Sequence, residues 1–496
     1  MAECQGKRGL VMDEPLIFER GREGRKNNFF PPSDIPRVRP QDVIPTDYLR
    51  DEIEGFPEVS ELEVVRHFTR LSSWNYGVDT GFYPLGSCTM KYNPRVNEDI
   101  AGFSGFSKSH PYQPSDLSRG ALQLMYELEG CLSEISGMDA VTLQPAAGAQ
   151  GELTGMLMVR AYHRDRGEER DRVLIPDTAH GTNPASSALC GYKVVGIKSG
   201  KDGIIHPEVV EEAMDEGVAA IMLTNPNTLG LFEKHIMEIA EIVHSKGGLV
   251  FCDGANLNAL MGIVRLGNLG VDVMQFNLHK TFSSPHGGGG PGSGPVGVKM
   301  LLEPYLPNPR IIHKDGGYEL DHRRSESIGR LKPFYGNFGV MVRAYAYIKR
   351  LGGEGLKRVS ELAVLNANYI KERLKPHYHL PYDIPCMHES VFSDKFQQEH
   401  GVKTIDMAKR LIDCGYHPPT IYFPLVVSGA MMIEPTETED KKTLDDFIEA
   451  MIEIARECKE QPQVVRNAPH NTKVGHLDEV RAAREPVLRY RFEKTC

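Results

Sequence analysis

Short apolar runs alternate with amphipathic stretches through the middle of the chain. The apolar runs have the length of buried strands and lie at 172–176, 194–198, 218–224 and 249–253. Around them apolar residues recur every three or four positions, which predicts helices at 117–136, 150–163, 206–216 and 233–246. Strands that alternate with helices of this length predict a doubly wound, mostly parallel α/β sheet that binds its ligand at the carboxyl edge.

The pattern changes on both sides of this region. Residues 1–60 are rich in proline and lack periodicity, which indicates either disorder or an arm laid on another surface, and the spaced prolines favour an arm. Ser60 with Glu63 forms a capping box that opens a helix at 60–71. After Gly336 the expected elements are helices at 341–351 and 355–375, short strands near 384–393 and 421–428, and a helix after Thr438. Residues 461–496 read as a polar tail.

These changes suggest three parts. They are an N-terminal arm with a helical segment (1–115), a large cofactor-binding α/β domain (116–335) and a small C-terminal α+β domain with the tail (336–496).

Composition excludes several classes of protein. The 496 residues include 57 Lys+Arg and 67 Asp+Glu without a basic block, so we expect no nucleic-acid partner. No apolar segment approaches the ~18 residues of a membrane span, and the amino terminus lacks a signal sequence, so a cytoplasmic protein without membrane contact is expected. The nine cysteines show no metal-ligand spacing, so neither a disulfide framework nor a metal site is expected.

The most distinctive stretch is 271–298, VDVMQFNLHKTFSSPHGGGGPGSGPVGV. A strand-like apolar run ends here in His279-Lys280, and lysine is rarely buried unless it is paired or has reacted. Taken alone, Lys280 could be an ordinary surface lysine just past a strand. The glycine cluster that follows indicates backbone that adopts positive φ or approaches another group closely. Gly292, Gly294 and Gly297 have the spacing of a dinucleotide-binding motif, but Pro295 lies inside it and no helix start follows, so that motif is rejected.

A lysine at a strand end can form a Schiff base with a carbonyl cofactor such as pyridoxal phosphate. That cofactor also needs a carboxylate for its pyridine nitrogen, a group against its ring and an anion site for its phosphate. Asp253 ends the apolar run LVFCD, 27 residues before Lys280, so the two could lie on neighbouring strands, although an Asp-Gly turn is the simpler interpretation of Asp253 alone.

Two segments further upstream supply the other requirements. His180, in DTAHGTNPA, could stack on the ring, contact the substrate carboxylate or be a polar loop residue without a role. Gly148, Ala149 and Gln150 begin a helical pattern, so their backbone N–H groups could bind a phosphate. An ordinary helix start is the alternative for these three residues.

The order of phosphate turn, His180, Asp253, Lys280 and glycine loop resembles the fold-type I pyridoxal-phosphate enzymes. More narrowly, NLHKTF followed by PHGGGGPGSGPVGV, with QPAAGAQGE, DTAHGTNPA and DGAN, resembles the glycine decarboxylase (P-protein) family of the glycine cleavage system. The resemblance runs from PLIFERGREGRK through FYPLGSCTMKYNP to MIEPTETE, which is nearly the whole chain.

The resemblance implies a reaction, a cofactor and partners. Glycine would lose its carboxylate as CO2 on pyridoxal 5'-phosphate, and the aminomethyl group would pass to the lipoyl arm of the H-protein. The lipoyl disulfide is reduced, which makes the enzyme an oxidoreductase. The chain matches the carboxyl-terminal half of longer family members, which implies a separate homologous subunit 1 and an α2β2 complex.

The resemblance also assigns residues. Lys280, Asp253 and His180 are expected to be catalytic, and Gly148, Ala149, Gln150 and Asn277 to bind the cofactor with them. The turn-forming segment 81–95 adds Ser87, Cys88 and Lys91 as substrate-side candidates, or else it is a well-packed loop.

Two other functions stay open on the sequence alone. Another fold-type I enzyme, such as an amino-acid decarboxylase or a cysteine desulfurase, would share Asp253 and Lys280, and a desulfurase would add a mobile catalytic cysteine. A non-catalytic scaffold subunit is the second alternative, and Lys280 argues against it.

Overall fold

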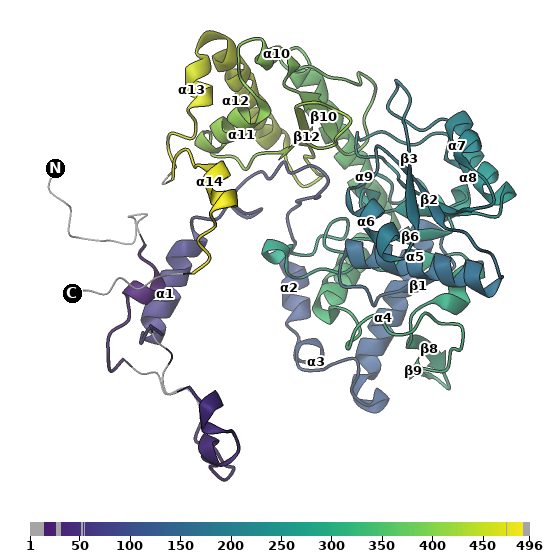
Figure 1. Ribbon diagram of the computed structural model, residues 1–496, viewed down its shortest axis with the longest axis vertical. Coiled ribbons are helices and arrows are strands. Elements are labelled where there is room, and N and C mark those ends of the chain that lie inside the picture. The colour runs from purple at the N-terminus through teal and green to yellow at the C-terminus, as the bar shows by residue number, and fades with distance from the viewer. Residues whose placement is uncertain (1–13, 26–30, 51–52, 54, 473, 490–496) are drawn as a thin grey trace. The chain divides into compact units, whose positions relative to one another are not determined.

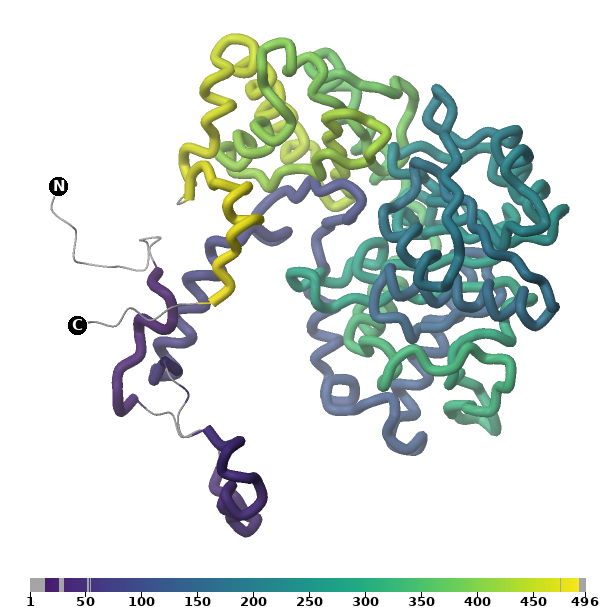
Figure 2. Tube along the Cα trace, in the orientation of Figure 1, coloured from purple at the N-terminus to yellow at the C-terminus, as the bar shows by residue number. Residues whose placement is uncertain are grey.

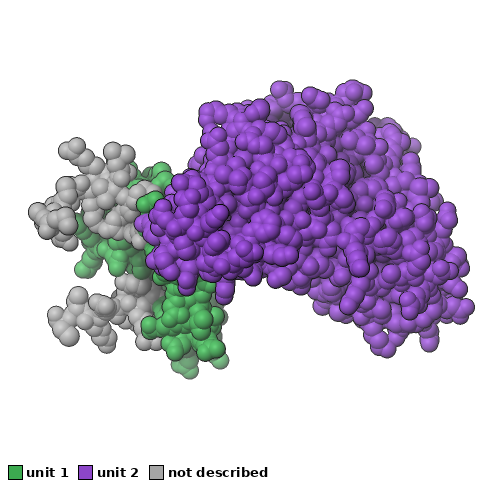
Figure 3. Space-filling view, turned by 90° about the horizontal axis from the view of Figure 1, so that it is seen from above, with its two compact units in different colours: residues 1–77, 471–496 green, residues 78–470 purple. Residues whose placement is uncertain are grey.

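The computed structural model describes residues 14–25, 31–50, 53, 55–472 and 474–489. The chain divides into two compact units, one made of 1–77 with 471–496 and the other of 78–470, which Figure 3 shows in different colours. The further division of the second unit at residue 336 stays a prediction.

A seven-stranded sheet forms the centre of the unit 78–470. Its order is β1 (Ala140–Thr142), β7 (Val296–Val298), β6 (Val273–Gln275), β5 (Leu249–Asp253), β4 (Val218–Thr224), β2 (Arg172–Pro176) and β3 (Lys193–Ile197). Strand β7 runs opposite to the other six strands, because it pairs antiparallel with both β1 and β6. The other six strands therefore end at the same edge, as the sequence predicts for a mostly parallel sheet.

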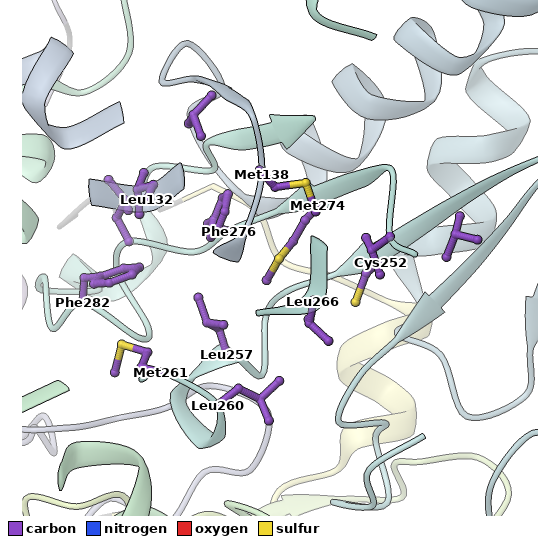
Figure 4. Close-up of a cluster of buried hydrophobic side chains, with 14 of the residues drawn as sticks. Leu132, Met138, Cys252, Leu257, Leu260, Met261, Leu266, Met274, Phe276 and Phe282 are labelled. Carbon is purple, nitrogen blue, oxygen red and sulfur yellow. The ribbon is translucent and has the colours of Figure 1, made fainter. Parts of the chain in front are cut away.

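Alternate residues of each strand point into two separate hydrophobic layers, because side chains in a strand alternate between faces. On β4, Ile221 and Leu223 join one buried cluster while Ala220 and Met222 join the other. Figure 4 shows the first cluster, where Cys252 and Met274 come from neighbouring strands. The sheet is thus covered on both faces, which explains its nearly continuous apolar strands.

Helices supply the two outer layers, as Figure 1 shows. One layer contains α4 (Ser115–Ser136), α7 (Pro207–Ala213), α8 (Ile236–Ser245) and the first half of α9 (Phe338–Leu374). The other contains α5 (Gly148–Asp165) and α6 (Thr182–Leu189). The shorter elements of this part are α2 (Arg95–Ala101), α3 (Ser104–Ser107), η4 (Leu257–Ala259), η5 (Leu266–Leu269), η6 (Gly287–Gly289) and η7 (Met300–Tyr305).

Residues after Gly336 build a second core around a three-stranded antiparallel sheet. Its strands are β10 (Ser390–Ser393), β12 (Ala430–Ile433) and β11 (Thr420–Ile421). The second half of α9, with α10 (Lys395–Gln398), α11 (Thr404–Asp413), α12 (Lys441–Glu460) and α13 (Pro462–Arg466), packs with this sheet. The chain can be followed through these helices in Figure 2. The two helices predicted at 341–351 and 355–375 form α9, which is interrupted at Gly352 (φ 62°, ψ −175°).

Three details differ from the sequence prediction. The strand expected at 421–428 is wrong beyond Ile421, because Tyr422 takes a positive φ of 57° and the next strand begins only at Ala430. A hairpin of β8 (Arg310–Lys314) and β9 (Gly317–Asp321) was not predicted, although Asp315-Gly316 between alternating residues is a hairpin signal. The polar tail was expected from 461, but Val465 of α13 is fully buried.

The unit formed by 1–77 and 471–496 contains few regular elements. Its described residues include η1 (Ile17–Glu19), η2 (Pro40–Asp42), η3 (Thr46–Tyr48), α1 (Glu61–Ser72) and α14 (Glu479–Arg484). The predicted capping box is present, since Ser60 accepts a hydrogen bond from the Glu63 N–H and the Glu63 carboxylate accepts one from Ser60. Within the described ranges of the whole chain, no helix has the length and apolarity needed to cross a membrane.

Candidate functional site

The predicted site residues meet at the carboxyl edge of the large sheet. Asp253 is the last residue of β5, and Lys280 follows five residues after the end of β6. These strands are parallel neighbours, with Asp253 opposite Gln275, as their spacing suggested. His180 lies in the loop between β2 and α6, at the same edge.

Asp253 accepts four hydrogen bonds although it is only 1% exposed. One oxygen accepts from His180 Nδ1 at 2.9 Å and from Asn183 Nδ2 at 3.1 Å. The other accepts from the Ala255 N–H at 3.0 Å and from the Gln275 amide. Burial alone would raise the pKa of this carboxyl group, but the charge and hydrogen bond of His180 outweigh it and hold the pKa below its ordinary value. Asp253 therefore remains a carboxylate.

His180 connects this carboxylate to the loop at 86–91. Its Nδ1 bonds Asp253, and its Nε2 lies 2.5 Å from the Ser87 hydroxyl oxygen. The ring lies nearly parallel to the Phe423 ring, with an angle of 10° and centroids 6.5 Å apart. The imidazole orientation is thus fixed by two polar partners.

The predicted phosphate turn is the first turn of α5. Gly148 begins the helix, and the preceding residue, Ala147, provides no side-chain cap. A Cβ at Gly148 would lie 2.5 Å from Asn277 Oδ1, so glycine is required there by the neighbouring amide. The structure brings Asn277 to the helix start, where uncapped N–H groups and the helix dipole favour an anion.

Close backbone contact with this turn explains why the loop contains glycines. The Gly294 N–H donates to the Pro145 carbonyl at 2.9 Å. A side chain at Gly294 would overlap the Ala147 carbonyl, and one at Gly292 would lie 3.0 Å from the Ala146 carbonyl. The loop is therefore a structural support of the helix start, which agrees with the close approach expected from its composition.

The charge of Lys280 shifts the pKa values of several neighbouring carboxyl and imidazole groups. Its ammonium group favours the carboxylate forms of Glu389 and Glu434, and it opposes protonation of His286. Burial lowers the pKa of His279 to about 3 and that of His286 to about 4, with Lys280 adding to both shifts. Two neutral imidazoles therefore adjoin the lysine near neutral pH.

Two acidic residues that the sequence analysis did not select lie near Lys280. Glu389 precedes β10 and Glu434 follows β12, two strands that pair antiparallel with Ser390 opposite Ile433. Continuing that register by one residue places the two glutamates opposite each other. No motif marks them, because the sequence does not reveal strand register.

The three substrate-side candidates have different surroundings. Ser87 contacts His180, and its N–H donates to Glu389 Oε2 at 2.8 Å. Cys88 is close enough to Lys280 for the two charges to interact, but burial raises the pKa of its thiol. The Lys91 ammonium donates to Asn258, Tyr347 and Glu437, so its three N–H bonds are used. Lys91 therefore reads as a buried structural lysine.

Comparison with known families decides the identity of this arrangement. Residues 38–315 match the family model "Glycine cleavage system P-protein", and residues 359–473 match "Glycine dehydrogenase, C-terminal domain". The chain belongs to the glycine cleavage system P-protein family. The predictions of a fold-type I pyridoxal-phosphate enzyme and of a glycine decarboxylase are thereby confirmed.

Relatives within the P-protein family match the chain almost end to end. Proteins named "Probable glycine dehydrogenase (decarboxylating) subunit 2" from Halalkalibacterium halodurans and from Caldanaerobacter subterraneus subsp. tengcongensis are each 58% identical over 96% of this chain and 98% of their own. Among solved structures, a glycine decarboxylase (P-protein) in inhibitor-bound form has a TM-score of 0.71 at 21% identity, covering 83% of this chain and 94% of that one. A NifS-like protein shares the fold with a TM-score of 0.59 at 16% identity, covering 76% and 99%.

The residues present fit pyridoxal phosphate. The α5 start offers an anion site of backbone N–H groups, and the Thr281 hydroxyl, fully buried beside Lys280 in the sequence, has no hydrogen-bond partner within the described part of the chain. Asp253 offers a carboxylate, whose four donors already occupy its lone pairs. A pyridine nitrogen bound at Asp253 would share or displace one of these donors. His180, with 13% of its side chain exposed, is the most accessible of the donating side chains.

Proposed function

We propose that this chain is the cofactor-bearing subunit of a two-subunit glycine decarboxylase that passes the aminomethyl group of glycine to the lipoyl arm of the H-protein. The observation that carries the proposal is the convergence of Lys280, Asp253, His180 and the start of α5 at one sheet edge. The family shows the glycine decarboxylase activity, and the lipoyl arm of the H-protein as acceptor is part of the proposal.

Each residue has a distinct part in holding the cofactor. Lys280 would bind it covalently through Nζ, and Asp253 would keep its pyridine nitrogen protonated. His180 would lie against the ring, with the N–H groups of Gly148, Ala149 and Gln150 on the phosphate. Asn277 would position the first turn of α5 through its contact with Gly148.

When bound, pyridoxal phosphate withdraws electrons from the glycine carbon that loses CO2. This chain's residues would support that chemistry electrostatically. The buried Asp253 carboxylate keeps its negative charge because His180, Asn183 and two further donors stabilise it. The carboxylate charge is therefore available without reorganisation of its surroundings.

The lipoyl disulfide completes the reaction as the electron acceptor. The aminomethyl carbon forms a bond to one sulfur, the S–S bond breaks, and the other sulfur leaves as a thiolate that takes up a proton. The relatives' designation as subunit 2 indicates a partner subunit, which we propose is a homologue that lacks the lysine.

The test uses the chain purified together with its partner subunit. Wild-type protein should show a visible absorbance band of bound cofactor that changes on adding glycine, and should exchange the glycine carboxylate with labelled bicarbonate in the presence of H-protein. Lys280→Ala should abolish exchange, whereas Lys314→Ala, on the exposed β8–β9 hairpin, should leave it unchanged. Borohydride reduction that attached the cofactor to another lysine would contradict the assignment.

Cysteine desulfuration is the second candidate, because Cys88 lies near Lys280 and the fold is shared with a NifS-like protein. Burial, together with Glu434 and Glu389, disfavours the thiolate that such a reaction needs. Release of sulfide equivalents from free cysteine, lost in Cys88→Ala, would favour this alternative over glycine decarboxylation.

A further inference from the structure

A fully buried polar cluster lies beside Lys280 and has no part in the roles assigned above. His388, Glu389 and Glu434 are each 0% exposed, and one potential ligand atom from each lies within 4.8 Å of the others. Both ring nitrogens of His388 and one oxygen of each glutamate have no hydrogen-bond partner within the described residues. Unsatisfied buried polar atoms are costly, so the cluster calls for a physical explanation.

The loop at 86–91 is held against this cluster in a strained conformation. Ser87 and Thr89 adopt positive φ angles of 63° and 49°, which non-glycine residues rarely do. The Ser87 N–H donates to Glu389 Oε2 at 2.8 Å, and the Thr89 N–H donates to Glu434 Oε2 at 2.9 Å. Such strain persists where surrounding contacts impose it and is concentrated at functional sites.

A hydrogen-bonded chain joins the cluster to the cofactor residues. Glu389 bonds the backbone of Ser87, the Ser87 hydroxyl bonds His180, and His180 bonds Asp253. Glu389 is therefore linked through Ser87 to the proposed site.

We propose that Glu389 and Glu434 are positioning residues for Lys280: they share one proton, and the single negative charge left on the pair faces the lysine. Two fully buried carboxylates that lie opposite each other cannot both ionise without a large cost in free energy, whereas one shared proton satisfies the two unpartnered oxygens. This inference rests on the proposed role of Lys280 as the residue that binds the cofactor.

The charges around the pair support one negative charge. Burial raises the pKa of both carboxyl groups, and the charge of Glu434 adds to the shift of Glu389. Lys280 opposes both shifts, while the hydrogen bonds of Thr89 and the charge of Lys91 oppose that of Glu434. His388 contributes no charge near neutral pH, because burial lowers its pKa to about 3, with His180 and Lys280 adding to the shift. Burial likewise keeps the Cys88 thiol protonated. A metal ion would add positive charge where Lys280 and Lys91 already lie close.

The first measurement is infrared spectroscopy of the cofactor-free complex at neutral pH. A shared proton gives the wild type one carbonyl-stretching band that both Glu389→Gln and Glu434→Gln remove, because the remaining carboxyl group then ionises. Glu233 is a buried acid outside the pair, and the Glu233→Gln variant identifies its carbonyl band. As a control, the Glu233 band must persist in both Glu389→Gln and Glu434→Gln.

The second measurement is the pH titration of the absorbance of cofactor bound to Lys280. Each single variant keeps one negative charge and should barely move the midpoint. The double variant loses the charge, and the midpoint should fall by about one pH unit or more, since a nearby opposite charge shifts a pKa by that amount.

The alternatives give different patterns. If both acids were ionised, no band would be lost and each single substitution would move the midpoint. If both acids were protonated, each substitution would remove half of the carbonyl band, and even the double variant would leave the midpoint of the absorbance titration unchanged. Stoichiometric metal that either substitution releases would also overturn the proposal. The infrared result stands even if the cofactor fails to bind Lys280, which separates this proposal from the proposed function.

Discussion

Asp253 is held by more donors than its assigned role requires. His180, Asn183, Ala255 and Gln275 satisfy its oxygens before any cofactor nitrogen arrives. The carboxylate is therefore preorganised, and its charge rather than its shape should matter to the reaction.

Asp253→Asn tests this expectation, because it keeps the shape and removes the charge. The exchange rate of the glycine carboxylate should fall on the order of 100-fold, the loss typical of removing one electrostatic stabiliser. Cofactor affinity should change much less, since the substitution leaves the proposed phosphate site at α5 intact. Equilibrium dialysis and exchange assays measure the two effects separately, and near-normal exchange would show that Asp253 has another role.

A buried acid away from the site predicts a pH effect on stability. Glu233 is 1% exposed, and burial raises its pKa to about 7 although Ile205 N–H and Asn227 donate to it. The folded state thus holds a proton that the unfolded state releases above its lower pKa. The stabilisation is complete below that lower pKa, declines as the pH rises and is lost above about 7.

Glu233→Gln should remove this pH dependence. Urea unfolding midpoints across the pH range should decline less steeply with rising pH than in the wild type, whatever the absolute cost of the lost hydrogen bond. Glu208→Gln, on the exposed side of α7, is the matched control. An unchanged slope in the Glu233 variant would contradict the assignment.

At the scale of single residues, the sequence predicted those site residues that lie in motifs or at the ends of strands. Lys280, Asp253 and His180 each end or follow an apolar run, and the structure places them at one edge. Glu389 and Glu434 could not be found that way, because what joins them is the pairing of β10 with β12 across a separation of 45 residues. Register of that kind is decided by packing and not by local pattern.

Among the elements, the glycine loop shows how backbone contact selects a residue. Gly294 lies so close to the Ala147 carbonyl that no side chain fits, and backbone cannot yield as a side chain can. A Cβ at Gly290, in the same loop, would make only an ordinary contact, 3.9 Å from the Gly287 carbonyl oxygen. One glycine is therefore required by contact and the other is not.

Gly294→Ala should displace the turn that begins α5 and weaken cofactor binding by about tenfold or more, equivalent to about 1.4 kcal/mol. Gly290→Ala should bind the cofactor normally. Fluorescence or absorbance titration with pyridoxal phosphate gives both affinities, and equal affinities would show that the loop does not support the phosphate site.

The strands that were predicted well have unbroken apolar runs, such as β2, β4 and β5, whose bounds match the expected ranges. The hairpin of β8 and β9 was missed because its strands carry mixed polarity, and 421–428 was misassigned because apolar residues there continue past Tyr422, where the backbone turns. Local polarity alone does not reveal where a chain reverses direction.

On the scale of the whole molecule, α1 carries apolar residues that the described part of its own unit leaves about half exposed. Leu62, Val65 and Phe68 are each 55% exposed and lie three residues apart, which places them along one face of the helix. Covering each on association would contribute about 1–2 kcal/mol. Together with the relatives' designation as subunit 2, this face favours a permanent partner.

We expect this chain alone to be inactive or nearly so, and to form an α2β2 complex with the homologous subunit that lacks the lysine. Val65→Asp should weaken that assembly by about 10–100-fold, because a charge would replace an apolar contact. Glu61→Lys, on the polar start of the same helix, is the matched control. Co-expression, size exclusion and the glycine–bicarbonate exchange assay with H-protein measure assembly and activity together. Full activity of the lone chain would refute the two-subunit arrangement, and normal assembly of Val65→Asp would place the interface away from α1.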